Sequence, residues 1–329
     1  MWIAALIAAL ALGVVAGLAL IHVIGSFGVW VVIHRSQGVI PPVATPLELR
    51  RFFRDVFREW LWTTVFLCLR VPGMLSVPVR RKACRAGQTP IVLVHGYSQS
   101  WTNFVFLSPR LGRAGLGPRY SVNVRPIFGP MEDLADHLSA AIDRVLAATG
   151  AEQVDVVAHS MGGLLAREID QRDARAARRR LRRIITLGSP HRGSVMSFLA
   201  LGDNARAMVP DSPFLRALAV PAEQRLIAIR GVRDNLVIPN DLGRIGEGGI
   251  DLVVEGVGHF GLLGSRHVAS LVASALRGEV GEGSEGSEGS EGSEGSEGSE
   301  ASAAGASGGD QVAVAEDASS VRAEPHRAG

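Results

Sequence analysis

The sequence predicts an α/β fold with a mostly parallel central sheet, preceded by a transmembrane helix and followed by an acidic tail. Three observations lead to this prediction. Short β-branched apolar runs alternate with amphipathic helical stretches from Thr89 to about Arg277. Residues 2–33 contain no Asp, Glu, Lys or Arg, and a Glu-Gly-Ser repeat fills much of the C-terminal end. These extremes exclude both a simple soluble enzyme and a wholly disordered chain.

The N-terminal apolar run is long enough to cross a membrane. Its 32 uncharged positions exceed the roughly 20 that a helix needs to span the hydrocarbon core. We therefore predict a transmembrane anchor over residues 1–34. A cleaved signal peptide is the alternative, but such a peptide normally begins with basic residues, and no Lys or Arg precedes Arg35. Gly13 and Gly17 form a GxxxG pair, so a helix-mediated dimer is a further hypothesis.

The segment that follows, residues 35–85, reads as an amphipathic juxtamembrane region. Apolar side chains recur at helical spacing between Pro46 and Val71, and arginines occupy the other faces. Such a helix lies on an anionic leaflet or packs on the globular domain, and the sequence does not choose between these alternatives. Basic residues next to a span tend to stay cytoplasmic, which predicts a cytoplasmic catalytic domain. The residues concerned are Arg35, Arg50, Arg51, Arg54 and Arg58.

The overall charge of +2 conceals two oppositely charged parts. Residues 279–329 carry 12 acidic and 2 basic side chains. The whole chain has 34 basic and 32 acidic residues, so residues 1–278 have a net charge of +12. Six Glu-Gly-Ser triplets run from Glu282 to Ser299, and they cannot bury enough apolar surface to offset chain entropy. We predict a disordered acidic tail over residues 279–329.

Between these ends, residues 86–278 are expected to form the catalytic domain. Its clearest helix spans Met131 to Ala148, with acidic residues in its first turn and Gly150 just beyond its end. The two cysteines, Cys68 and Cys84, indicate no disulfide framework. The predicted strands are Ile91–Val94, Ser121–Arg125, Val154–Ala158, Arg183–Leu187, Arg225–Ile229 and Asp251–Val254.

The strongest chemical motif is the sequence VDVVAHSMGG, which spans residues 154–163. A buried strand stops at Ser160, and small residues and a helical run follow at once. This is the pattern of a nucleophile elbow, with Ala158 in the place of its first glycine. A tight strand-to-helix turn lifts the serine hydroxyl above the sheet edge, and the backbone N–H of Met161 can face a developing oxyanion.

An acid and a histidine follow the serine in chain order. Asp234 and His259 each lie in a loop just beyond a predicted strand, at the same sheet edge as Ser160. A histidine there can take and return the serine proton, while the aspartate orients its ring. Asp241 is a competing acid. The early turn His95-Gly96 is expected to supply a second oxyanion donor, the N–H of Tyr97, with His95 itself fixing the loop.

Together these pieces resemble the α/β-hydrolase family, and within it bacterial triacylglycerol lipases and related membrane-anchored hydrolases. The resemblance covers about 190 residues. It implies an α/β-hydrolase fold with a short cap, and it makes His191 a structural residue beside the active site. The motifs that carry it are VHGY at 94–97, AHSMGG at 158–163, TLGSPHRGS at 186–194, DNLVIP at 234–239 and GVGHFGLL at 256–263.

The cap is expected between Ser194 and Val220, where apolar side chains suit an acyl chain or simply cover the core. The candidate substrate-binding residues are Phe198, Leu199, Met208 and Phe214. Seven arginines between Arg172 and Arg183 suggest either an anionic partner or, more simply, a solvated helix end. No phosphate-loop, CxxC or HExxH motif is present, so neither metal nor organic cofactor is expected, and no nucleic acid partner.

The sequence therefore predicts a membrane-tethered serine hydrolase that cleaves carboxylic esters, most simply acyl-lipid or other apolar esters. Ser160 is the expected nucleophile, His259 the base and then the acid, and Asp234 the orienting acid. Two alternatives stay open. One is an acyltransferase that uses the same triad, and the other is a non-catalytic membrane scaffold built on a hydrolase fold.

Overall fold

A computed structural model describes residues 2–39, 45–74, 84, 88–219, 225–246, 248–280 and 321–323. One seven-stranded sheet in the order β2-β1-β3-β4-β5-β6-β7 forms its centre. The first six strands are parallel, and β7 runs antiparallel to β6. The strands are β1 Ile91–Val94, β2 Arg119–Val122, β3 Val154–His159, β4 Leu181–Leu187, β5 Leu226–Gly231, β6 Ile250–Val254 and β7 Val321–Ala323.

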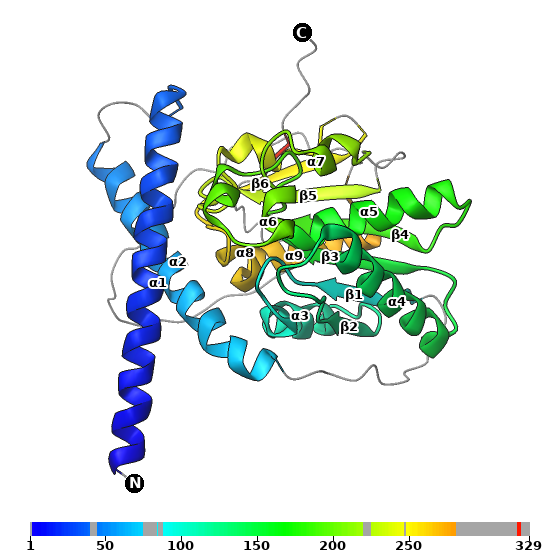
Figure 1. Cartoon of the computed structure of the whole chain (residues 1–329), viewed down its shortest axis with the longest axis horizontal. Helices are drawn as coiled ribbons and strands as arrows, with labels where there is room; N and C mark the ends of the chain where they lie inside the picture. Colours follow the sequence, from blue (N-terminus) through cyan, green and yellow to red (C-terminus); the bar gives the residue numbers. More distant parts are fainter. Residues whose placement is uncertain are drawn as a thin grey trace, which may run out of the picture.

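Helices cover both faces of this sheet (Figure 1). One apolar layer lies between the sheet and α4 and α5, and the other lies between the sheet and α3, α8 and α9. The α-helices are α1 Trp2–Ser36, α2 Pro46–Gly73, α3 Leu107–Arg113, α4 Met131–Thr149, α5 Met161–Arg175, α6 Asp203–Ala207, α7 Pro213–Ala217, α8 Gly261–Gly264 and α9 Arg266–Arg277. The 3-10 helices are η1 Trp101–Phe104, η2 Val195–Leu199 and η3 Asn240–Gly243.

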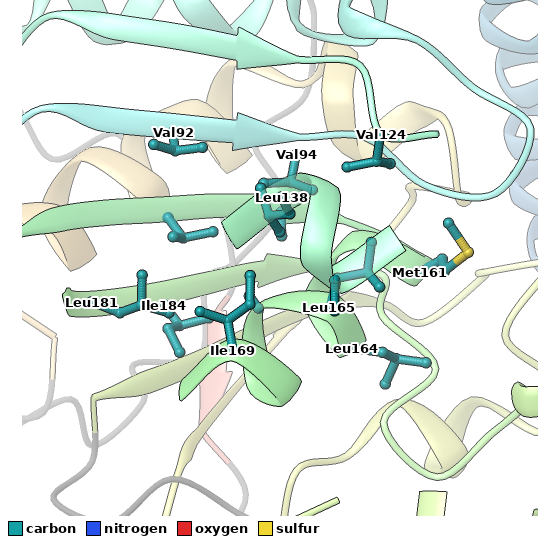
Figure 2. Close-up of a cluster of buried hydrophobic side chains, with 14 of the residues drawn as sticks. Val92, Val94, Val124, Leu138, Met161, Leu164, Leu165, Ile169, Leu181 and Ile184 are labelled. Atoms are coloured by element: carbon teal, nitrogen blue, oxygen red, sulfur yellow. The ribbon is translucent and has the colours of Figure 1, made fainter. Parts of the chain in front are cut away.

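The first apolar layer joins the predicted strands to the predicted helices. Figure 2 shows Val94 of β1 and Ile184 of β4 in one buried cluster with Leu138 of α4 and Leu165 of α5. All four side chains are completely buried. Strands that are covered on both faces in this way are continuous apolar runs, as the sequence indicates. Gly150 ends α4 in the left-handed conformation, with φ of 71°.

The predicted α/β architecture is confirmed, but the second strand is displaced. The sequence predicts it over Ser121–Arg125, whereas β2 ends at Val122. The next two residues leave the sheet, and each takes part in a hydrogen bond with the loops that follow β1. Asn123 accepts a hydrogen bond from the backbone N–H of Trp101 (2.7 Å), and the N–H of Val124 donates to Nε2 of His95 (3.1 Å).

Helices α1 and α2 lie together on one side of the α/β domain (Figure 1). Within the described part of the chain, one helix is long and apolar enough to cross a membrane, over Ala5–Ser36. Length and composition alone define it, so a signal sequence passes the same test. Gly13 and Gly17 have open space around them, and the dimer stays a prediction.

The amphipathic segment is helical as predicted, and a capping box of Thr45 and Glu48 begins α2. Its two faces differ. Glu59 and Phe66 are buried against the domain, whereas Phe53 and Phe57 are more than half exposed. The helix therefore packs on the globular domain, which is one of its two predicted alternatives. A second apolar face, with Phe53 and Phe57, is not covered by the described residues.

The predicted tail contributes one described segment beyond Val280. Val321–Ala323 pairs with β6 as the edge strand β7, although the prediction places it in a disordered tail. Residues 281–320 and 324–329, on which the rest of that prediction falls, lie outside the described residues.

Candidate active site

Ser160 occupies a sharp turn between β3 and α5. Its φ is 55° and its ψ is −129°, and its backbone N–H donates to the carbonyl of Leu187 (2.9 Å). A positive φ at a residue other than glycine stores strain of about 1–3 kcal/mol, which the surrounding structure must hold. The neighbouring glycine of the β1 loop is required, because a Cβ on Gly96 would lie 2.6 Å from Cβ of Ser160. The turn therefore presents Ser160 at the end of the buried strand β3.

Asp234 and His259 are in direct contact. Asp234 follows β5, His259 follows β6, and Nδ1 of His259 lies 2.9 Å from Oδ2 of Asp234. Oδ1 of Asp234 accepts hydrogen bonds from the N–H groups of Leu236 (2.9 Å) and Val237 (2.8 Å). Burial lowers the pKa of His259, but the negative charges of Asp234 and of Glu59 outweigh it, so the net pKa is raised.

The serine turn adjoins this pair through Gly188. Gly188 directly follows Leu187, the backbone partner of Ser160. A Cβ on Gly188 would lie 2.8 Å from Oδ2 of Asp234 and 3.2 Å from Nδ1 of His259. Oγ of Ser160 makes no hydrogen bond to His259 in the described part of the chain. Such bonds often tighten only when substrate is bound, so the geometry remains compatible with proton transfer.

The N–H groups of Tyr97 and Met161 stand at the same edge. Neither donates to another backbone group among the described residues. Met161 is the first residue of α5, where N–H groups lack partners within the helix and the helix dipole favours negative charge. Both donors are therefore available to an anion that forms near Ser160.

The geometry can be compared with known folds. The crystal structure of Aspergillus fumigatus lipase B matches 61% of this chain and 55% of its own, with a TM-score of 0.50 and 19% identity. Phospholipase PlaB from Legionella pneumophila matches 58% and 60%, with a TM-score of 0.51 and 14% identity. The protein has the α/β-hydrolase fold. At these identities the likeness concerns the fold alone.

Sequence comparison adds shorter matches to this α/β-hydrolase chain. The model of the PGAP1-like alpha/beta domain matches residues 128–246. Triacylglycerol lipases from Pseudarthrobacter phenanthrenivorans and Burkholderia plantarii are each 42% identical over 59 residues, which is 18% of this chain. The matches span only 17% and 15% of those lipases. The chain is thus similar to lipases in fold and, over 59 residues, in sequence.

Asp234 and Asp241 are the two candidates for the acid that orients His259. Asp241 is exposed at the start of η3 and has no hydrogen bond to His259, whereas Asp234 has two close contacts with it. The geometry of this hydrolase fold therefore favours Asp234.

Two other histidines fix loops. Nε2 of His95 accepts from the N–H of Val124, so its Nδ1 donates to the carbonyl of Gly96 (2.9 Å). Burial lowers the pKa of His95 to about 4, so it stays neutral near pH 7. His191 is 3% exposed, and its Nε2 bonds Oγ1 of Thr186 (2.9 Å). Both contacts fit the structural roles expected for these residues.

Gln99 and His159 also belong to the site, although neither was among the predicted site residues. Oε1 of Gln99 accepts from the N–H of Gly96 (2.9 Å) and lies 2.9 Å from Nδ1 of His159. Nε2 of His159 lies 3.1 Å from the carbonyl oxygen of His259. These side chains thus connect the Tyr97 loop, the serine turn and the His259 loop. The position of His159 directly before Ser160 was the one available signal.

Two further side chains, Glu59 and Asn235, bond to the backbone at and just after His259. Glu59 of α2 accepts from the N–H groups of Phe260 (2.6 Å) and Gly261 (2.9 Å). Asn235 accepts from the N–H of His259 (3.4 Å) and donates to Oγ of Ser26 in α1 (2.7 Å). Their partners are far away in sequence, and no local pattern marks these contacts.

The predicted substrate-binding residues separate into two groups. Phe198 and Leu199 of η2 are 69% and 74% exposed. Met208 is buried in the core, and Phe214 packs against it. The cap reaches the site through Tyr97, whose hydroxyl donates to the carbonyl of Leu201 (2.8 Å). Of the four predicted residues, only Phe198 and Leu199 are therefore open to a ligand.

The arginine-rich run is largely neutralised by acids of the domain. Arg172 pairs with Glu168 and Asp136, Arg180 with Asp173 and Asp143, and Arg182 with Asp155. These ion pairs tie the end of α5 and the start of β4 to α4 and β3. The simpler interpretation, a structural helix end, accounts for them. The described residues hold no group of three His, Cys, Asp or Glu suited to a metal ion.

Glu59 should make stability depend on pH. Burial raises its pKa from 4.5 to about 7, although the Phe260 and Gly261 N–H groups oppose this. The folded state then binds the proton more tightly than the unfolded state. The stabilising contribution of proton binding by Glu59 is complete below pH 4.5, and it disappears as the pH rises through about 7. We expect the free energy of unfolding to fall by about 3 kcal/mol from this source.

Urea unfolding in detergent at pH 5 and pH 8 checks this prediction. Glu59→Gln has no titratable carboxyl and should remove this part of the slope, so its stability relative to the native protein should be about 3 kcal/mol more favourable at pH 8 than at pH 5. Equal pH slopes for the two proteins would contradict the assignment.

Proposed function

We propose that this protein is a serine hydrolase that cleaves carboxylic esters through an acyl-enzyme. The observation that carries the proposal is the buried Asp234–His259 hydrogen bond beside the strained serine turn. Order along the chain, serine then aspartate then histidine, agrees with hydrolases of this fold. The triacylglycerol lipases that match part of the chain support the same reaction class.

In the proposed reaction, Oγ of Ser160 attacks the acyl carbonyl while Nε2 of His259 takes its proton. The N–H groups of Tyr97 and Met161 bind the oxyanion. His259 then gives the proton to the alkoxide, and the alcohol leaves. A water molecule, deprotonated by His259, attacks the acyl-enzyme, and the acid and free Ser160 result. Asp234 holds Nδ1–H of His259, so Nε2 is the nitrogen that can accept the proton.

We propose an acyl-lipid or another apolar ester as the substrate. The cap exposes the apolar side chains of Phe198, Leu199 and Leu201, and the carbonyl of Leu201 accepts from the hydroxyl of Tyr97. Each CH2 of a chain buried there would contribute about 0.8 kcal/mol. Triacylglycerol lipase and phospholipase are the printed names of two of the similar proteins.

The proposed location is a membrane, which the N-terminal part of the apolar run 2–33 enters as a single span, because Ser26 and Trp30 near its end are bonded to the α/β domain. The basic residues after the span favour a cytoplasmic hydrolase domain. Residues 1–34 would be the anchor, 35–85 the juxtamembrane segment, 86–278 the catalytic domain and 279–329 the tail. Protease protection in sealed vesicles tests the orientation.

Hydrolysis of p-nitrophenyl esters from short to long acyl chains by the full chain in detergent tests the function. Activity above the Ser160→Ala background that peaks at long chains supports a lipase-like enzyme. A short-chain peak supports an esterase and overturns the lipid substrate. A folded protein with no activity above the background overturns the proposed hydrolase.

The cap supplies a separate prediction. Phe198→Ser combined with Leu199→Ser should raise KM for a long-chain ester about tenfold, because contact with several CH2 groups is lost. The KM for acetate esters should change little. Paired kinetic measurements on both substrates check this, and an equal effect on both would place these side chains away from the acyl chain.

A further inference from the structure

We propose that helices α1 and α2 complete the active site, with Glu59 as a positioning residue for the segment that carries His259. This inference rests on the proposed function and deepens it. The helices that look like an anchor would then determine the position of the proposed base.

Glu59 is the strongest link. It is 1% exposed, and its two carboxylate oxygens accept the N–H groups of the two residues that follow His259. Backbone donors at a tight turn have few other acceptors, and an unsatisfied buried group costs about 1–3 kcal/mol. The fit is close, because a Cβ on Gly258 would lie 2.5 Å from Oε2 of Glu59. The residues on both sides of His259 are therefore shaped around this carboxylate.

A second link joins α1 to the same segment. Ser26 is 2% exposed, and its Oγ accepts from Asn235, which in turn accepts from the backbone N–H of His259. Asn235 also directly follows Asp234. Trp30 of α1 donates to Oδ1 of Asn240 (2.7 Å), and Asn240 donates to the carbonyl of Asp234 (2.8 Å). Both loops of the proposed acid-base pair are thus bonded to α1.

A third link lies one residue before Asp234. Nε of Arg233 lies 2.9 Å from Oδ2 of Asp55 in α2, and its guanidinium lies 5.5 Å from the ring centroid of Phe52. Asp55 is buried, so this ion pair is protected from solvent. Three independent contacts from two helices therefore converge on the loops of Asp234 and His259.

The charges around His259 allow a test by the pH profile of kcat/KM, which a loss of global stability alone would not shift. Asp234, Glu59 of α2, His159 of β3 and His22 of α1 all act on its ring or interact with it electrostatically. Glu59 also borders a cavity of about 470 Å³ lined by Arg58, Arg110 and Arg266. Because ionised Glu59 raises the pKa of His259, its neutralisation should lower that pKa.

The experiment measures kcat, KM and the pH profile of kcat/KM for the full-length protein in detergent, with p-nitrophenyl butyrate as the probe. For Glu59→Gln we expect kcat to fall about tenfold, KM to stay within about twofold, and the acid limb of the profile to move to lower pH. An amide can accept only one of the two N–H groups and would turn its own N–H₂ toward the other.

Asp251→Asn is the matched control. Asp251 is a mostly buried carboxylate that pairs with Arg230 and accepts the N–H of Ile245, but it has no contact with the His259 segment among the described residues. It should leave kcat and the acid limb unchanged. Ser26→Ala keeps α1 helical and should lower kcat several-fold without moving the limb.

The outcomes separate the two proposals. An active native protein with unchanged kcat and profile in both Glu59→Gln and Ser26→Ala overturns the positioning role alone. A native protein that is inactive and is not labelled at Ser160 by a serine-directed phosphonate overturns the proposed function. If Glu59→Gln does not fold, the Ser26→Ala kinetics decide.

Discussion

Replacing Ser160 with Ala is expected to lower ester hydrolysis by at least about three powers of ten. The variant keeps the oxyanion donors and the substrate contacts but has no nucleophile, and serine enzymes without theirs retain only this residual catalysis. Folding should be unaffected, because the Ser160 hydroxyl has no hydrogen-bond partner among the described residues. Initial rates with a p-nitrophenyl ester and circular dichroism check both statements.

Ser189 offers a matched control for this substitution. Its buried hydroxyl has no hydrogen-bond partner within the described residues and lies next to the serine turn, where a Cβ on Gly163 would lie 2.2 Å from its Oγ. Ser189→Ala should keep its activity and still gain the mass of a serine-directed phosphonate. Labelling of Ser160→Ala at any other serine, with retained hydrolysis, would refute Ser160 as the nucleophile.

Asp234→Asn is expected to lower kcat/KM by about 10⁴-fold. Two backbone N–H groups, from Leu236 and Val237, already point at Oδ1 of Asp234. An asparagine would place its carbonyl oxygen there and its N–H₂ toward Nδ1 of His259. Nδ1 would then become the acceptor, and Nε2 would carry the proton that it must instead take from Ser160. The loss follows from this tautomer rather than from displacement of the side chain.

The same measurement on Asp241→Asn serves as the comparison. Asp241 is exposed and has no hydrogen bond to His259, so the variant should keep activity within about twofold of the native protein. An inactive Asp241→Asn beside an active Asp234→Asn would transfer the role of the acid to Asp241.

The sequence predicted the elements whose apolar pattern is local. The strand over Ile91–Val94 and the helix from Met131 appear where predicted, because burial on both faces or on one stripe leaves a regular signal. The end of the second strand was missed because the Asn123 side chain accepts from the backbone N–H of Trp101, and the Val124 N–H donates to the His95 side chain. Such competition depends on tertiary contacts, which periodicity does not contain.

The residues of the candidate site also divide into those marked by a local sequence pattern and those placed only by tertiary packing. Ser160, Asp234 and His259 each follow a predicted strand, and parallel strands bring their carboxyl ends to one edge. Glu59 lies 201 residues before the N–H group of Phe260 that it accepts. In the sequence it sits among arginines on an amphipathic helix, where a carboxylate normally faces water. Only the packing of α2 on the domain gives it a buried partner.

The contacts of α1 also set how far the hydrolase domain can stand from a lipid bilayer. Nε1 of Trp60 in α2 donates to the carbonyl of Ala16 (2.9 Å), so about 14 residues of α1 precede its first bond to α2. At 1.5 Å per residue they span roughly 21 Å, which is less than the hydrocarbon thickness of about 30 Å.

If this N-terminal part of α1 were inserted, it would therefore draw the exposed Phe53 and Phe57 of α2 against the headgroups, with the edge of the sheet that carries Ser160 close behind them. No flexible linker would then separate the hydrolase domain from the leaflet. Encounter with a lipid ester would then be a two-dimensional search, and the rate would follow the mole fraction of that ester in the bilayer rather than its concentration in the bulk solution.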